Sequence, residues 1–528
     1  MKKTLMILML LGAMLPVYSQ PDSVVERIIE IGKTDNSTMQ HLDVLCNRFG
    51  GRLVGSDAFE NAADWAASKF ENWGMEVMMD EAGEVPVGFN RGPWFGRMLS
   101  DNGMHLHFAT PSYTSGTKGV QRGHVVIEPS NQREFDRMKK HLNGAWVLIG
   151  GESSGWPIDW SAAGDARRDS IKLVNEDINE QNSVIRRENK EAREAGRPEK
   201  ELISRIEEPA LFYKEMREAG ILGIIQSAKV PIRVLYDRKN IMQMTFDSLP
   251  TVPDIKLDEH QYAIIRQMAE ERHYFLLEFD IRNHFKMGPV KYHNVIGVIE
   301  GTEFPDEYVI MGAHLDAYDV ATGGVDDGSG ATPTMEAARL IMEAGGKPRR
   351  TILVMLFAGE EFGLWGSQSW IDRNPEKLAH ISNMINRDGG PTAPMSVSVP
   401  ASMREDFEAI CEPISRINPD FPFTINERDP MERPAKAWGT DSGPFAVAGV
   451  PVIGFNCEDP KGYNFSYHEI WHTERDLYNK SIPEYQEHAA IATAIMVYGL
   501  ANLDHLLPAD EYYITNQVEK PEKKKNRN

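Results

Sequence analysis

The segment YVIMGAHLD, residues 308–316, has the pattern of a buried β-strand that ends in polar side chains. Its apolar run is short and contains β-branched residues, which favours a strand covered on both faces. The run is followed by His314 and Asp316. An imidazole and a carboxylate at the carboxyl end of a buried strand predict a binding site at that edge of a sheet.

Comparable segments lie on both sides of this strand in the sequence. The apolar runs are NVIGVIEG at 294–301, RTILVMLFAGEE at 350–361, ISNMINRDGG at 381–390 and PVIGFNCED at 451–459. Helical patterns separate several of them, notably ATPTMEAARLIMEAG and GSQSWIDRN. The alternation predicts an α/β fold with a mostly parallel central sheet and helices on both of its faces.

The remaining sequence predicts further parts of the chain. MKKTLMILMLLGAMLPVYSQ has two lysines and then an apolar stretch, as in a cleaved signal peptide. We therefore expect an exported protein, periplasmic or extracellular, with no membrane anchor after cleavage. The expected divisions are a signal peptide at 1–19, a helical N-terminal part of the main domain at 20–115, an inserted β-rich domain at 116–290, the main domain at 291–508 and a C-terminal tail at 509–528.

The inserted region contains several expected strands and one unusual segment. Strand-like runs include GVQRGHVVIEPS, NGAWVLIGG, PIRVLYD and TVPDIKL, and a helix with a strand is expected in EPALFYKEMREAGILGIIQSA. Residues 164–207 are dense in charge and in good helix formers, which predicts exposed helical excursions.

The composition excludes some classes of function. The chain has 528 residues, 41% of them hydrophobic and 26% charged, and a net charge of −21. This balance argues against a nucleic-acid partner, because phosphate binding rests on Lys and Arg. Its three cysteines allow at most one disulfide and exclude a disulfide-rich scaffold.

Potential metal ligands follow the expected strands of the main domain. Besides His314 they are Asp326 and Asp327 in one turn, the pair Glu360 and Glu361, Asp388, and His472. Burial of uncompensated carboxylates is costly, and a pair of divalent cations would supply the compensating charge. Histidine with carboxylates, and no cysteine, suits zinc or a similar metal.

Five ordered motifs, HLDAYDVATGGVDDGSGA, AGEEFGLWGS, NRDGG, GTDSGPFAVAGVPVI and HTERD, resemble the co-catalytic di-zinc exopeptidase family. That family includes bacterial leucyl-type aminopeptidases and glutamate carboxypeptidases, and the motif spacing is most similar to that of plasma glutamate carboxypeptidases. GRLVGSDAFENAADWAASKFENWG resembles its N-terminal segment. The resemblance implies a zinc-exopeptidase, phosphorylase/hydrolase-like fold, with a protease-associated-like domain in the inserted region.

The resemblance also implies roles for single residues. Two zinc ions per chain would share Asp326; the other ligands would be His314 and Asp388 at one ion, and Glu361 and His472 at the other. Glu360 would be the general base that activates a metal-bridging water, and the carboxylate of Asp316 would hold the imidazole of His314 by its other nitrogen. The Asp326–Asp327 peptide would be cis.

The implied activity is a secreted zinc-dependent exopeptidase that hydrolyses terminal bonds of peptides or dipeptides. Trp438, Asp441, Tyr463 and Tyr467 are candidates for the substrate pocket. Ser442 stands where aminopeptidases of the family often have histidine, so the pocket is expected to differ. Arg91, Arg387 and Lys436 are basic residues near the motifs, but Arg387 is expected to point away from the site. A homodimer is the default expectation for a symmetric assembly.

Three other interpretations remain open. The string His468-Glu469-Ile470-Trp471-His472 matches the H-E-x-x-H signature of mononuclear zinc proteases, but its usual downstream extension is absent. A glutaminyl-cyclase-like acyltransferase would bind a single zinc. A non-catalytic binding protein would keep the fold without the reaction. The choice between the amino and the carboxyl end of a substrate is also open.

Overall fold

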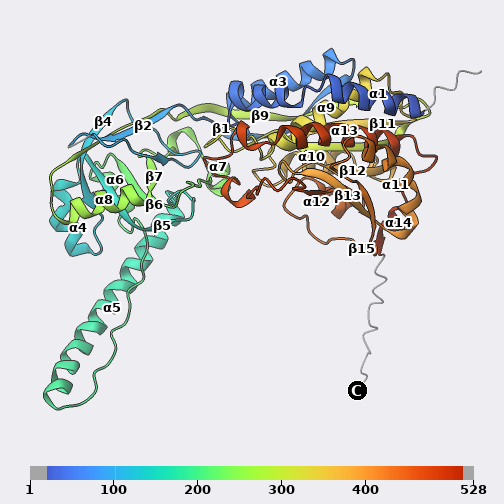
Figure 1. The fold of residues 1–528 in the computed structure, drawn as a ribbon. Helices are drawn as coiled ribbons and strands as arrows, with labels where there is room; N and C mark the ends of the chain where they lie inside the picture. Colours follow the sequence, from blue (N-terminus) through green and yellow to red (C-terminus); the bar gives the residue numbers. More distant parts are fainter. Residues whose placement is uncertain (1–20, 101–102, 515–528) are drawn as a thin grey trace, which may run out of the picture.

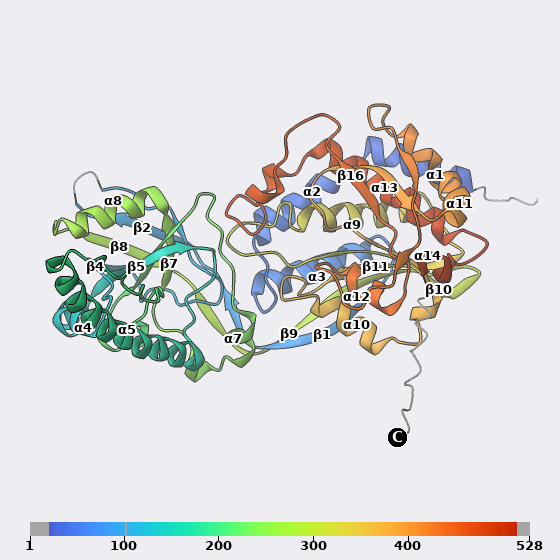
Figure 2. The same ribbon diagram turned by 90° about the horizontal axis from the view of Figure 1, so that it is seen from below.

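The computed structural model describes residues 21–100 and 103–514, which form two lobes joined by a pair of long strands (Figure 1; Figure 2). The expected signal peptide lies outside the described residues. In the described residues no helix is both long enough and apolar enough to span a membrane. All three cysteines lie in this part of the chain and are unpaired.

The main lobe is built on a five-stranded sheet. In spatial order its strands are β1 (Glu76–Asn90), β9 (His284–Ile299), β11 (Arg350–Phe357), β10 (Phe304–His314) and β12 (Ile381–Asn386). β10 is parallel to both β11 and β12, whereas β9 is antiparallel to both β1 and β11. The sheet is therefore mixed and not mostly parallel, because the two long connecting strands pair as an antiparallel ribbon.

Helices cover both faces of this sheet. On one face lie α1 (Pro21–Thr34), α3 (Asp57–Asn72), α9 (Gly328–Glu343) and α13 (Pro483–Ala501); α2 (Thr38–Asp43) continues into a π-helix at Val44–Phe49. On the other face lie α10 (Trp365–Arg373) and α12 (Ser442–Ala448). Alternate residues of β10 enter the two cores, Val309 and Met311 on the first face and Ile310 on the second.

A smaller sheet flanks the central one and corrects two expectations. It contains β14 (Thr424–Glu427), β13 (Ala393–Val399) and β16 (Phe455–Glu458), with α11 (Arg404–Cys411) nearby. PVIGFNCED was expected in the central sheet, but its strand β16 pairs antiparallel with β13. The tail was expected from 509, but α14 (Ala509–Tyr512) and β17 (Tyr513–Ile514) are ordered parts of the lobe, with β17 paired to β15 (Met431–Glu432).

The second lobe is α/β and not simply β-rich. Its seven strands are, in order, β2 (Trp94–Met98), β8 (Leu276–Ile281), β4 (Gln121–Ile127), β5 (Ala145–Ser153), β6 (Gly223–Ala228), β7 (Asp254–Asp258) and β3 (Phe108–Ala109). Its helices are α4 (Gln132–Met138), α6 (Tyr213–Glu218) and α8 (Glu259–Glu270), whereas α7 (Arg238–Gln243) packs against β1. Since β2 and β3 belong to this sheet, the lobe begins before residue 116.

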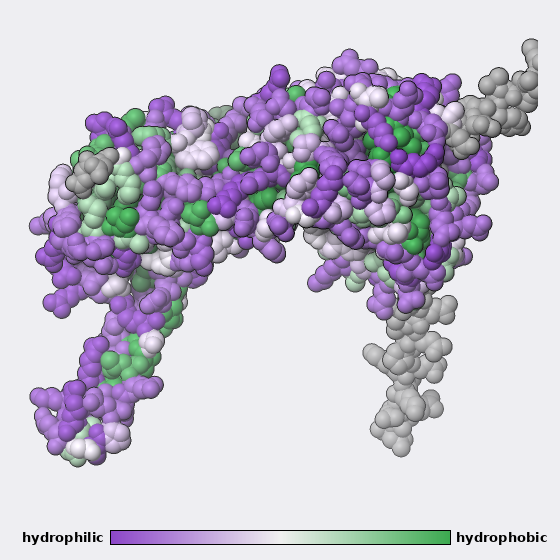
Figure 3. Space-filling model, in the orientation of Figure 1, coloured by the Kyte–Doolittle hydropathy of each residue, from purple (hydrophilic) through white to green (hydrophobic). Residues whose placement is uncertain are grey.

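A long arm projects from the second lobe, as the charge pattern predicted (Figure 1; Figure 3). It consists of α5 (Ala162–Glu194) and a return segment with no regular secondary structure. Asn175, Asn182 and Asn189 recur every seven residues on α5, and all three are buried. Each amide both donates to and accepts from the backbone of one residue of the return segment: Ile206, Ile203 and Lys200 respectively.

The segment PIRVLYD, residues 231–237, was expected to be a strand, and this is wrong. It is a loop that packs against the main lobe, which explains its apolar character. Arg233 forms an isolated antiparallel bridge with Thr473. The ring of Tyr236 stacks on Phe362 with centroids 4.4 Å apart. The loop therefore brings the second lobe beside the segment that contains His472.

Candidate metal centre

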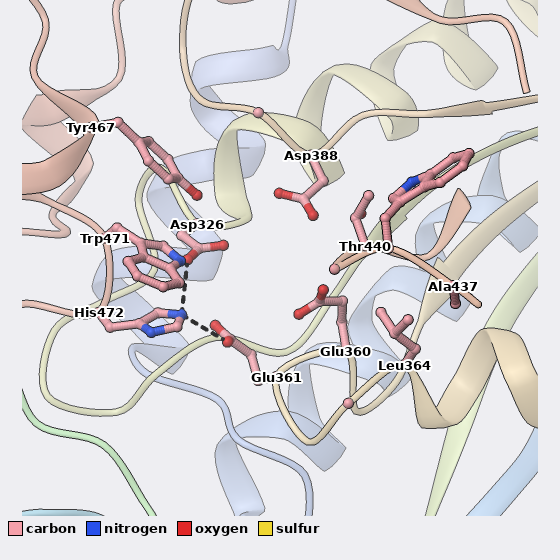
Figure 4. A pocket seen from close by; sticks show the side chains of 14 residues that line it. Asp326, Glu360, Glu361, Leu364, Asp388, Ala437, Thr440, Tyr467, Trp471 and His472 are labelled. Atoms are coloured by element: carbon pink, nitrogen blue, oxygen red, sulfur yellow. Dashed lines mark ion pairs between the residues drawn. The ribbon is translucent and has the colours of Figure 1, made fainter. Parts of the chain in front are cut away.

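Five chain segments converge at the carboxyl end of the central strands, and Figure 4 shows four of their side chains: Asp326, Glu361, Asp388 and His472. His314 is the last residue of β10, Glu361 follows β11, and Asp388 follows β12. Asp326 lies two residues before the start of α9, and its peptide bond to Asp327 is cis, as expected. His472 lies in a loop before α13 and has a positive φ of 59°.

The converging side chains form two groups that share Asp326. One contains His314, Asp326 and Asp388; the other contains Asp326, Glu361 and His472. Within each group the candidate ligand atoms lie within 4.8 Å of one another. His314 Nε2 is 3.3 Å from Asp326 Oδ1, and His472 Nε2 is 3.1 Å from Glu361 Oε2 and 3.5 Å from Asp326 Oδ2. The two groups contain the same residues as the two ligand sets that the family resemblance implied.

The hydrogen bonding of these groups fits metal ions. His314 Nε2, Asp326 Oδ2 and Glu361 Oε1 are buried and have no hydrogen-bond partner among the described residues. Buried polar atoms normally have a hydrogen-bonding partner, so several unpaired ones in the same site indicate that the site binds another group. Imidazole nitrogens and carboxylate oxygens at this spacing suit zinc or another divalent cation.

The pKa values of the site residues also fit the binding of positively charged metal ions. Burial raises the pKa of Glu361 well above its usual range, and the charge of Asp326 adds to this. Burial also raises the pKa of Asp388. Burial lowers the pKa of His472 to about 4, which keeps its imidazole neutral and able to bind a metal.

The two groups border a cavity, which is lined by Asp326, Glu361, Asp388 and His472. Glu360 also lines this cavity but belongs to neither group. The cavity has a volume of about 640 Å³. Burial raises the pKa of Glu360 to about 9, and the nearby charges of Asp441 and Asp388 act in the same direction. The carboxylate of Glu360 therefore lies beside the two groups and is not itself one of the candidate ligands.

Asp316 has a different contact from the one expected. His314 Nδ1 lies 2.9 Å from the backbone oxygen of Asp316, and the carboxylate of Asp316 is farther away, at 3.7 Å. That carboxylate instead accepts hydrogen bonds from the backbone N–H groups of Gly359, Glu360 and Glu361. It therefore fixes the turn that carries both glutamates.

Two further residues support the site and were not singled out from the sequence. Asp476 accepts hydrogen bonds from the N–H groups of Val325 and Asp326, at 2.6 and 3.3 Å. Arg52 is fully buried, and its guanidinium donates to backbone oxygens of the loop after β10 and of its own segment: Leu315, Thr322, Gly323 and Gly50. Both residues lie within motifs quoted for the family resemblance, which was the only signal for them.

The expected pocket residues divide into two pairs. Trp438 and Tyr467 line the cavity, together with Trp471, which the sequence did not single out as a pocket residue. Asp441 is fully buried and accepts a hydrogen bond from Ser367, and Tyr463 is 56% exposed; neither lines the cavity. The indole of Trp438 donates to the hydroxyl of Ser442, the residue expected to change the pocket.

The H-E-x-x-H string does not form one site. Tyr467–Glu469 is a short 3-10 helix, and both His468 and Glu469 are exposed. Among the described residues only His472 of this string belongs to a group that could hold a metal.

The other basic candidates do not line the cavity. Arg91 pairs with Asp319 at 2.8 Å, Lys436 is exposed, and Arg387 is buried beside Phe455.

Comparison with known proteins gives three similarities. Carboxypeptidase Q of Mus musculus is 22% identical over 92% of this chain and 91% of its own length. A probable glutamate carboxypeptidase of Zea mays is 32% identical over 43% of this chain and 33% of its own. The crystal structure of a peptidase M28 precursor from Shewanella amazonensis SB2B has a TM-score of 0.55 at 19% identity, covers 92% of this chain and 98% of that chain, and supports the fold alone.

A family comparison covers the segment that contains the site. Residues 294–497 match the model of peptidase family M28, and this range includes all five residues of the two groups as well as Glu360. Over this segment, which carries the candidate metal centre, the chain is similar to peptidase family M28.

Proposed function

We propose that this protein is an exported metal-dependent exopeptidase that removes a terminal residue from peptides or dipeptides. The observation that carries the proposal is the pair of ligand groups sharing Asp326, with the free carboxylate of Glu360 in the same cavity. The match of residues 294–497 to peptidase family M28 and the similarity to carboxypeptidase Q support it.

In this proposal the two groups would hold two divalent cations, for which zinc is the best fit. Asp326 would belong to both ligand sets; His314 and Asp388 would complete one set, and Glu361 and His472 the other. When bound, such cations lower the pKa of a water molecule and polarise a carbonyl group.

The protein's own residues supply the proton transfers and the geometry. Glu360 takes a proton from the attacking water and returns it to the leaving amine, as a general base and then a general acid. Its high pKa without cations reflects burial among carboxylates, and positive charge beside it would restore the ionised form. Asp316 holds the backbone of Glu360 and Glu361, so the base and one ligand keep a fixed separation.

The cavity offers apolar and aromatic surfaces to a substrate side chain. Trp438, Tyr467 and Trp471 line it. Arg233 of the second lobe lies over the ring of Trp471, at 4.4 Å from its centroid. We propose that this lobe, a protease-associated-like insert, completes one rim of the substrate site.

The alternatives predict different metal contents. A glutaminyl-cyclase-like enzyme would bind one ion, whereas the second ligand group around His472 favours two. A binding protein would release no amino acid. The H-E-x-x-H interpretation would require His468 as a ligand, and that residue is exposed.

A combined measurement of metal and activity tests the proposal. We expect about two zinc ions per chain by elemental analysis and release of free amino acids from unblocked dipeptides. Glu360→Gln should lower kcat by roughly 10²- to 10⁴-fold while the metal content stays near that of the wild type. The matched change Glu469→Gln should leave turnover unchanged. Wild-type activity in Glu360→Gln would refute the assigned base.

The same assay identifies the end of the substrate that is recognised. Dipeptides blocked at the amino terminus and dipeptides amidated at the carboxyl terminus are compared with the free dipeptide. Loss of cleavage with only the first block assigns an aminopeptidase, and loss with only the second assigns a carboxypeptidase.

A further inference from the structure

Arg387 has an unusual environment for a charged side chain. It directly follows β12 and precedes Asp388, and only 6% of its surface is exposed. The guanidinium lies beside the ring of Phe455, at 5.9 Å from the centroid. Its Nη1 donates to Cys457 Sγ at 3.6 Å, and its Nε is buried without a hydrogen-bond partner.

Comparison with the other buried arginines shows what is missing. Arg350 pairs with Glu307 at 2.6 Å, Arg339 with Glu336 at 2.6 Å and Arg168 with Asp165 at 2.6 Å, while Arg52 donates to backbone oxygens. In the part of the chain that the structure describes, the guanidinium of Arg387 has no carboxylate within 4.0 Å and no oxygen acceptor. A thiol is the sole hydrogen-bonding partner of this side chain there.

The neighbouring acids do not provide the missing charge. Asp388 belongs to one of the ligand groups, so its carboxylate is directed to the metal centre. Asp327 is fully buried, and neither of its carboxylate oxygens has a hydrogen-bond partner in the described residues. The charge of Arg387 acts on the pKa of Asp327, but the two side chains form no ion pair within 4.0 Å.

A cavity of about 200 Å³ lies against this guanidinium. Besides Arg387 its walls include Asn386, Asp388, Gly389, Thr392, Phe455 and Cys457. Thr392 contributes a hydroxyl group to the wall, whereas the hydroxyl of Ser329, also in the wall, donates to the backbone oxygen of Val325. The volume is below that of ordinary organic-ligand pockets, which are about 300–1,000 Å³, but it exceeds that of a single water molecule, about 30 Å³.

Burying an unpaired ion costs several kcal/mol even after relaxation of the protein, so a buried guanidinium requires a counter-charge. Since no carboxylate of the described residues forms an ion pair with this guanidinium, we propose that this cavity binds a small monovalent anion, a halide or a carboxylate of acetate size, against Arg387. The anion neutralises Arg387 next to Asp388, and therefore reduces the repulsion between this guanidinium and a cation held by the Asp388 group. The proposal does not depend on the peptidase activity.

Diffraction with bromide tests the site directly. Crystals of the full chain are soaked in sodium bromide, and anomalous differences are measured. We expect a bromine peak within hydrogen-bonding distance of Arg387 Nε, and its loss in Arg387→Gln crystals soaked in the same way. No peak in this cavity of the wild type, or an undiminished peak in Arg387→Gln, would overturn the proposal.

Thermal unfolding of the metal-stripped protein gives a second readout. At equal ionic strength, chloride or acetate should raise the melting temperature of the wild type relative to gluconate, a much bulkier anion. The rise should vanish in Arg387→Gln and persist in Arg404→Gln, a matched change at an exposed arginine that pairs with Glu408. Stabilisation by chloride alone assigns a halide site, and stabilisation by acetate assigns a carboxylate site. An equal rise in Arg387→Gln would exclude this cavity as the source.

Discussion

The carboxylate of Asp316 accepts a hydrogen bond of 3.1 Å from the backbone N–H of Glu361. The other carboxylate oxygen accepts from Gly359 and Glu360, so one fully buried side chain fixes three consecutive amides. The position of a candidate ligand and that of the candidate base thus depend on the same carboxylate. Asp316 is a positioning residue and does not itself line the cavity.

We therefore predict that Asp316→Asn lowers metal affinity and kcat by about 10- to 100-fold, the usual effect of losing a residue that orients ligands. An amide cannot accept with both of its ends, so one of the three N–H groups would face another donor. Metal titration and steady-state kinetics measure the effect. Asp372→Asn, at an exposed position on α10, is the matched control. Equal kinetics for both variants would argue against the positioning role.

The two histidines of the H-E-x-x-H string should differ in their effects. His472→Ala removes a residue of the second ligand group, so we expect the loss of roughly one of two metal ions per chain and of most activity. His468→Ala changes an exposed side chain and should leave both unchanged. Metal content of the two purified variants distinguishes the readings. The opposite result would support the mononuclear interpretation.

Arg52 should contribute mainly to the stability of the loop that leads to Asp326. Arg52→Met leaves several buried carbonyl groups without a donor, each costing about 1–3 kcal/mol, so we expect a loss of at least about 3 kcal/mol in the free energy of unfolding. Denaturant unfolding measures it. Arg48→Met, at an exposed arginine of the adjoining π-helix, should cost little. A small loss in Arg52→Met would mean that other contacts hold the loop.

The candidate ligands could be predicted from the sequence because most of them lie at the carboxyl ends of buried strands. His314, Glu361 and Asp388 each follow a buried strand, and the carboxyl ends of parallel neighbours meet at one edge, so their convergence could be inferred without coordinates. Family resemblance then divided them into two sets around Asp326. The sheet itself was predicted less well, because β1 and β9 pair antiparallel over a long separation in sequence that no local pattern reveals.

The residues that support the site were harder to predict from the sequence. Arg52 and Asp476 form hydrogen bonds with backbone groups, and every residue type has such groups, so the sequence does not show which ones they bind. Leu315, which accepts from Arg52, is 263 positions away. The segment 231–237 was wrongly predicted to be a strand, because an apolar run that packs on another lobe has the same composition as a buried strand.

His107 links the lobes in a pH-dependent way. Its Nε2 lies 2.7 Å from Glu474 of the main lobe, and its Nδ1 lies 3.2 Å from Asp258 of the second lobe. Partial burial opposes the charged form, but the two carboxylates outweigh it and raise the pKa of His107 above its usual 6.5. A raised pKa means that this contribution to stability is fully present below about 6.5 and is lost as the pH rises through the folded-state value.

We expect His107→Gln to lower the melting temperature at pH 6 and to have a much smaller effect at pH 9. Melting curves of both proteins across this range measure the difference. The matched control is His105→Gln, at an exposed histidine two residues away, which should show no such dependence. A penalty that stays constant with pH would assign His107 a packing role only.

The hydrogen bonds of the three arm asparagines should stabilise the arm alone. Asn182 donates to the backbone oxygen of Ile203 and accepts from its N–H, both at 2.8 Å, so Asn182→Ala removes two hydrogen bonds that hold the return segment against α5. At about 0.5–1.5 kcal/mol each, their loss should make local opening easier by about 1–3 kcal/mol. Faster amide exchange at Ile203, with unchanged exchange in the central sheet, is the expected result. Asn179→Ala, at an exposed asparagine of the same helix, should change neither. If Asn182→Ala instead lowered protection throughout the second lobe, the arm would be part of that lobe's cooperative core.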